Sequence, residues 1–149
     1  MNKEQTLQAL ENAKQSHIAQ MEKIKDLLEE KNVNSPTPLA KSECEFGKIL
    51  YGNREEFFSI LGAQFYEKLD FFHEQWHKEY LKIYEIFFAQ KKEGGIFSKL
   101  LGKNRLDPLV YDKAKLYYVE LQSVTNELLR LLDLSLRRAE ALSDSKFKS

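Results

Sequence analysis

The sequence predicts an all-α protein with the architecture of an up-down four-helix bundle, built from three long helices and one short helix. The main observation is that apolar residues recur at intervals of three and four along most of the chain, which is the period of a helix with one buried face. A second observation is that the interruptions, at about 32–38 and 91–108, contain proline or glycine. With 149 residues, the chain is long enough to form one domain, 1–149, around its own core.

The first predicted helix carries its apolar residues on one face. These residues are Leu10, Met21, Ile24 and Leu28. His17 falls on the same face, because it lies two helical turns after Leu10 and one turn before Met21. Two prolines in the segment 32–38 end this helix, since proline cannot continue the backbone hydrogen bonding. A short element with a turn or two of helix is predicted over 40–53.

A long helix is predicted from about Arg54 to Gln90. Its inward stripe is Phe58, Leu61, Phe65, Leu69, Phe72, Trp76, Tyr80, Ile83 and Phe87. His73 and His77 lie beside that stripe and are one helical turn apart.

A loop insertion is predicted at about 91–108, and the last helix begins near its end. Asp107 is a favourable N-cap and Pro108 suits the first helical turn. The inward stripe of this helix is Leu121, Val124, Leu128 and Leu131. The helix gives way to a polar tail at about 143–149.

Composition excludes several classes of function. The chain has 23 Lys and Arg against 23 Asp and Glu, so it lacks the basic surplus that binding to nucleic acid requires. Its single cysteine excludes an internal disulfide. No apolar stretch has the length of a signal peptide core or a membrane span, so we expect a cytoplasmic protein without membrane contact.

All four residues of the types that bind transition metals lie on or next to inward helical faces. His73 and His77 form the strongest pair, because a spacing of four places two imidazoles on one side of a helix. With His17 and Cys44 they would supply three imidazoles and a thiolate, a full tetrahedral shell for zinc. The alternative is that each histidine is a hydrogen-bonded core residue and that Cys44 is an inert small apolar residue. A zinc site requires that the segments carrying His17, Cys44 and the His73/His77 pair meet in the folded protein.

The order of these residues resembles the chemoreceptor zinc-binding (CZB) domain family. The matching residues are His17 in KQSHIAQMEK, Cys44 in CEFGKILYG, and His73 and His77 in FFHEQWHKEY. The resemblance extends from about Gln8 to Glu140. It implies a four-helix bundle that binds zinc through three histidines and one cysteine. This sequence departs from the family at two positions where tryptophan is common, with Gln20 three residues after the first histidine and Ile49 after Gly-Lys.

The resemblance implies a sensory or regulatory function and no enzymatic activity. Members of the family act mostly in cytoplasmic chemoreceptors and diguanylate cyclases. We therefore expect this chain to signal zinc level or oxidant to a chemotaxis or cyclic-dinucleotide pathway. No output module is recognisable in the 149 residues, so a stand-alone member would act by docking. A homodimer through helix faces is one route, and the apolar segment 96–101 among lysines is another.

Two other interpretations of the same residues stay open. The zinc could be purely structural and simply hold the bundle together. His73-Glu74-Gln75-Trp76-His77 also matches the HExxH motif of zinc metalloproteases, in which the glutamate is the general base. A protease of that kind needs a third ligand, and no histidine follows His77. Glu85 and Glu93 are the nearest acidic candidates.

Overall fold

A computed structural model describes residues 1–29, 40–89 and 107–148. These residues form helices and no strand, which confirms the predicted all-α class. The α-helices are α1 (Lys3–Leu28), α2 (Glu45–Gly52), α3 (Arg54–Leu61), α4 (Ala63–Tyr84) and α7 (Pro108–Ala141). Two shorter elements are the π-helix η1 (Glu85–Ala89) and the 3-10 helix η2 (Asp144–Lys146). The described residues thus contain three long helices, as expected in number, and two short α-helices where one was expected.

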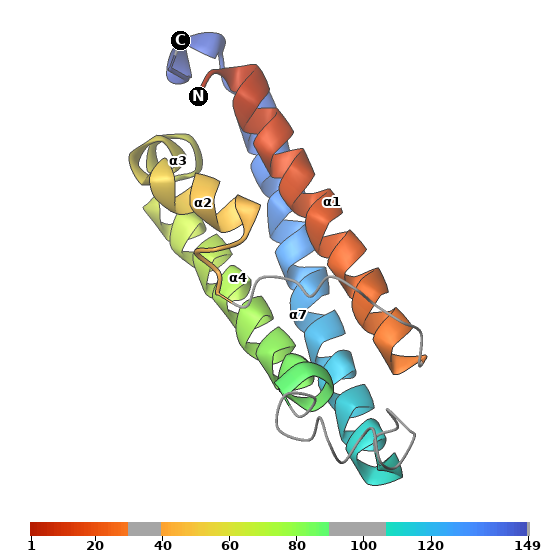
Figure 1. Cartoon of the computed structure of the whole chain (residues 1–149). Coiled ribbons are helices and arrows are strands. Elements are labelled where there is room, and N and C mark those ends of the chain that lie inside the picture. Colours follow the sequence, from red (N-terminus) through yellow and green to blue (C-terminus); the bar gives the residue numbers. More distant parts are fainter. Residues whose placement is uncertain (30–39, 90–106, 149) are drawn as a thin grey trace.

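The three long helices lie side by side, with α7 packed against both α1 and α4 (Figure 1). Along the bundle, α1 and α4 run in the same direction and α7 runs in the opposite one. Helix α2 packs against α1, while α3 contacts both α4 and α7. The two short α-helices also contact each other, and both lie beside the half of the bundle where α4 begins (Figure 1).

Helix α1 is capped at its start and buries the face that the sequence predicts. Asn2 caps it, accepting a hydrogen bond from the backbone N–H of Gln5, whose side chain accepts one from the Asn2 N–H in return. The buried face includes Leu10, His17, Met21 and Ile24, and Leu28 is partly buried at the end of the helix. His17 is thus held by a long, well-capped helix that packs along α7.

The single helix predicted from Arg54 to Gln90 is wrong, because Gly62 separates α3 from α4. Gly62 has a φ of 86°, in the left-handed region that an α-helix excludes and that glycine adopts without a steric penalty. The break also changes the buried face. Phe57 and Ile60 are buried in α3, whereas Phe58, Phe65 and Phe72 of the predicted stripe are only partly buried.

Beyond Gly62, the buried face of α4 contains both histidines. Its members are Tyr66, Leu69, His73, Trp76, His77, Tyr80 and Ile83. His73 and His77 therefore belong to the core stripe itself instead of lying beside it. The helix changes to the wider π-helical turn at Glu85.

Helix α7 begins where the sequence predicts. Asp107 is the N-cap and accepts a hydrogen bond from the backbone N–H of Leu109, with Pro108 in the first turn. Leu121, Leu128 and Leu131 are buried as expected, but Thr125 is buried where Val124 was expected. Helix η2 lies within the predicted polar tail.

Some sequence predictions fall outside the described residues. The proline segment 32–38 and the candidate docking segment 96–101 are among them, as is most of the predicted insertion 91–108. Within the described part of the chain, no helix combines the length and the apolar character needed to cross a membrane.

Candidate metal centre

His17 lies on α1, and one of its ring nitrogens is already hydrogen-bonded to the backbone. Its side chain is buried, and Nδ1 lies 2.7 Å from the backbone carbonyl oxygen of Ala13, one turn earlier in the helix. A carbonyl oxygen only accepts, so Nδ1 carries the hydrogen and Nε2 keeps a lone pair. Burial lowers the pKa of His17, so the ring is neutral at physiological pH. This is the protonation state and the ring orientation that a metal ligand needs.

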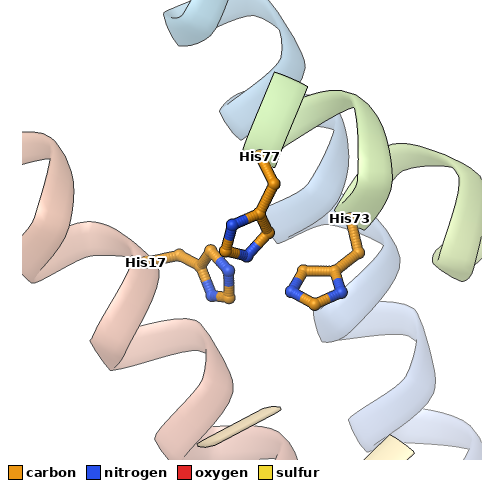
Figure 2. A group of neighbouring side chains, drawn as sticks. All are labelled: His17, His73 and His77. Carbon is orange, nitrogen blue, oxygen red and sulfur yellow. The ribbon is translucent and has the colours of Figure 1, made fainter. Parts of the chain in front are cut away.

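His73 and His77 approach the same point from α4 (Figure 2). Each of the three histidines offers a nitrogen, and these atoms all lie within 4.8 Å of one another. All three side chains are buried. Burial, together with the neighbouring His17, His77 and Lys41, lowers the pKa of His73 to about 2. His17 and His73 are thus held without charge, and the three close, buried imidazoles are near enough to bind one metal ion.

Cys44, at the beginning of α2, contacts one of the three histidines, His73. It is the N-cap residue of that helix, and its Sγ accepts a hydrogen bond from the backbone N–H of Gly47 at 3.3 Å. The same Sγ lies 3.3 Å from Nε2 of His73. Burial raises the pKa of the Cys44 thiol, so without a metal the group is a neutral thiol.

Gly47 explains why the chain can bring Cys44 to this position. A Cβ atom placed on Gly47 would lie 1.6 Å from the backbone carbonyl oxygen of Lys41. The turn before α2 therefore folds directly onto the backbone of that helix, and only glycine permits so close an approach. Glycine three residues after the cysteine is a structural requirement for the position of the sulfur.

The residues around these four side chains form a mostly aromatic wall. The ring of Trp76 lies 4.9 Å from that of His17, and the ring of Phe46 lies 4.9 Å from that of His73. Trp76 also donates a hydrogen bond to Thr125 Oγ1 on α7, which ties the wall to the third long helix. A cavity of about 150 Å³ remains between the elements, and its lining includes His17, Cys44 and His77.

Cys44 and His73 lie at the separation expected for two ligands of one zinc ion, whereas the three imidazoles are more widely spaced. Bonds of about 2.0 Å to nitrogen and about 2.3 Å to sulfur in a tetrahedron place the ligand atoms roughly 3.3–3.6 Å apart. The distance of 3.3 Å between Cys44 Sγ and His73 Nε2 agrees with this value. The widest separation among the imidazole nitrogens, 4.8 Å, is about 1.5 Å larger. Three nitrogens and a thiolate suit zinc better than magnesium or calcium, which prefer oxygen.

Tyr51 contacts His73 through Nδ1, the nitrogen away from Cys44, and is itself hydrogen-bonded to Asp70. Neither residue was expected from the sequence. The Tyr51 hydroxyl lies 3.2 Å from His73 Nδ1 and donates to Asp70 Oδ1 at 2.5 Å. Lys41 Nζ lies 3.0 Å from the same carboxylate oxygen. Burial and the neighbouring carboxylate raise the pKa of the Tyr51 phenol well above its usual value. The only sequence signal is the position of Asp70, nearly one turn before His73 on the same helix.

Glu74, the acidic residue of the HExxH match, lies at the surface. Its side chain is 42% exposed, and its two carboxylate oxygens form ion pairs with Lys41 at 3.7 Å and Lys78 at 3.8 Å. A general base in a zinc protease must instead reach a water bound to the metal.

Comparisons with protein-family models, with curated proteins and with solved structures find no match for this chain. The resemblance to the CZB family therefore depends on the motif residues of the sequence alone and stays a prediction.

Proposed function

We propose that this chain is a regulatory zinc-binding protein whose ion is held by His17, Cys44, His73 and His77. The proposal is supported above all by the convergence of three separate elements. Histidines from α1 and α4 offer nitrogens within 4.8 Å of one another, and the sulfur at the N-cap of α2 lies 3.3 Å from one of these rings. Burial of polar groups costs free energy unless they are hydrogen-bonded or bind a shared metal ion.

A regulatory role follows from the placement of the ligands on different elements. Zinc bound at this site would connect α1, α2 and α4, so occupancy would control how firmly α2 is held against the long helices. The ion would also hold Cys44 as a thiolate, which is open to oxidation, and oxidation would weaken the metal bond. Zinc level and oxidant are therefore the two signals that this site can receive.

The setting of this function follows the family resemblance. We place the protein in the reducing cytoplasm, where a single cysteine stays available as a ligand. Its output would be docking to a component of a chemotaxis or cyclic-dinucleotide pathway, or to a second copy of the chain. We propose no catalytic role and no nucleic-acid partner. The exposure of Glu74 and its two ion pairs argue against the metalloprotease alternative.

Removal of zinc separates a regulatory site from a purely structural one. Purified without chelator, the protein should contain about one zinc per chain by elemental analysis, and absence of zinc would reject the proposal. Hydrogen exchange is then compared before and after treatment with a chelator. A regulatory site predicts increased exchange confined to α2 and the adjacent turns, with α1, α4 and α7 still protected. Loss of protection throughout the chain would mean that the zinc is only structural.

A matched control tests whether the increase of hydrogen exchange in α2 results from loss of zinc at this site. The double variant His17→Ala/His73→Ala should show the chelated pattern of α2 exchange before any treatment and should not respond to the chelator. A response of this variant equal to that of the wild type would show that the chelator acts elsewhere.

A further inference from the structure

The hydrogen bonds around His73 have a direction that the donors and acceptors determine. The Asp70 carboxylate only accepts, and a tyrosine hydroxyl has a single hydrogen. With Tyr51 Oη 2.5 Å from Asp70 Oδ1, that hydrogen lies between these two oxygens. The tyrosine oxygen then faces His73 Nδ1 at 3.2 Å with lone pairs only. His73 must therefore carry its hydrogen on Nδ1 and donate it to Tyr51.

This direction determines which nitrogen of His73 is available. A neutral imidazole with its hydrogen on Nδ1 has its lone pair on Nε2, the atom that lies 3.3 Å from Cys44 Sγ. The same hydrogen bond also holds the orientation of the His73 ring, because it connects this ring on α4 to Tyr51 on a different helix, α2. Lys41, 3.0 Å from Asp70, holds the carboxylate at the end of this chain of hydrogen bonds.

We infer that Tyr51 and Asp70 are positioning residues that increase the zinc affinity of this site by holding His73 in its ligating tautomer and orientation. The inference rests on the proposed zinc binding. A series of hydrogen bonds that ends on a carboxylate increases the basicity of the imidazole, so its Nε2 becomes a stronger metal ligand. His17 achieves the same result with the backbone carbonyl of Ala13. Loss of such an outer partner typically lowers metal affinity about 10–100-fold.

The experiment measures zinc affinity by competition with a chromophoric chelator at neutral pH. The proteins are the wild type, Tyr51→Phe, Asp70→Asn and the double variant. Each single variant should bind zinc about 10–100-fold more weakly. The double variant should be hardly weaker than Tyr51→Phe alone, because the two residues act in series through one nitrogen. Affinity unchanged in both single variants would overturn the inference.

Tyr66→Phe is the matched control. Tyr66 is a buried tyrosine whose hydroxyl donates to the backbone carbonyl of Leu50 at 3.0 Å, and it also connects α4 to α2. Its loss should reduce stability without changing zinc affinity. An equal loss of affinity in this variant would show that the effect is general destabilisation, and would overturn the inference.

Nitrogen NMR of the histidines in the zinc-loaded protein supplies a readout that stability alone would not change. The Nδ1 proton of His73 should be hydrogen-bonded in the wild type and should shift upfield in Tyr51→Phe. The Nδ1 proton of His17 should not move, because its partner is Ala13. A His73 protonated on Nε2 in the loaded wild type would overturn the inference.

The outcomes distinguish this inference from the proposed function. Wild-type protein that binds no zinc rejects both. Wild-type protein that binds zinc, with Tyr51→Phe and Asp70→Asn binding equally well, rejects only the positioning role. If Tyr51→Phe does not fold, Asp70→Asn carries the test, because Asp70 is about a third exposed and its replacement leaves no cavity.

Discussion

The histidines and the cysteine of the candidate centre are held by very different parts of the molecule. His17, His73 and His77 lie in the buried faces of α1 and α4, helices of 26 and 22 residues that pack along α7. Cys44 is a partly buried N-cap residue of α2, which has eight residues. Long packed helices keep their side chains in place without a ligand, whereas a short helix depends on its few tertiary contacts.

This difference indicates that the site has a rigid part and an adjustable part. The three imidazoles would supply three of the four ligands from long packed helices, and Cys44 would supply the fourth from an element with fewer contacts. A change at the sulfur, by loss of metal or by oxidation, would therefore release α2 before it disturbs α1 or α4. The following predictions test whether the two parts respond differently.

The largest effect is expected from His77→Ala. The change removes a ligand from the rigid part and leaves a cavity beside Trp76 and His17. We expect zinc affinity to fall by more than the roughly 10–100-fold that loss of an outer partner costs. Competition with a chelator measures the change in affinity.

Leu61→Ala serves as the matched control for this substitution. Leu61 is fully buried at the end of α3, so its truncation should cost about 2–5 kcal/mol of stability. It should leave zinc affinity unchanged. Equal zinc affinity in His77→Ala and the wild type would exclude His77 as a ligand.

A smaller loss is expected from Cys44→Ser. Three imidazoles can hold zinc with water in the fourth position, and serine is a favourable N-cap that can accept the Gly47 N–H in place of the sulfur. The variant should keep its helical content and bind zinc more weakly than the wild type but more tightly than His77→Ala. The same titration and circular dichroism measure this. An affinity below that of His77→Ala would contradict the division into a rigid and an adjustable part.

A pH dependence follows from the rigid part of the site. The pKa values of His17 and His73 are lowered in the folded protein, and that of an unfolded histidine is about 6.5. Below pH 6.5 the unfolded chain therefore binds more protons than the folded one. The free energy of unfolding of the metal-free protein should be fully present above about pH 6.5 and should fall progressively toward acid pH.

Urea unfolding of the metal-free protein at pH 7.5 and pH 5 tests this prediction. His73→Gln, which cannot titrate in this range, should reduce the difference between the two midpoints. A wild-type midpoint that is equal at both pH values would mean that the histidines are not held neutral.

The smallest effect is expected from Glu74→Gln. Its ion pairs with Lys41 and Lys78 are at the surface, where such pairs contribute about 0–1 kcal/mol. Zinc content, melting temperature and hydrogen exchange at α2 should all stay close to the wild type. A zinc-dependent peptidase activity that this substitution abolishes would favour the metalloprotease alternative.

The sequence predicts the long helices well because their apolar period is sustained over many turns. It also places His17 on an inward face and His73 and His77 beside one, and the structure buries all three. The break at Gly62 was missed because the period continues through Leu61 and Phe65. A glycine within a helical pattern does not by itself indicate a positive φ.

The partners of His73 were missed for a different reason. Tyr51 and Asp70 are residues that a helix commonly presents to solvent or to a neighbouring element, so neither stands out in the sequence. Their contact depends on where the tertiary structure places α2 relative to α4, which local periodicity does not determine. The contact between Cys44 and His73 is of the same kind. The sequence offers both as ligand types, and only the tertiary structure brings the two atoms together.

X-ray absorption at the zinc edge is the most direct test of a site with three histidines and one cysteine. For the zinc-loaded wild type we expect one sulfur at about 2.3 Å and three nitrogens at about 2.0 Å. Cys44→Ser should lose the sulfur contribution and keep the imidazole scattering. A wild-type shell without sulfur, or a shell without imidazole scattering, would contradict the account.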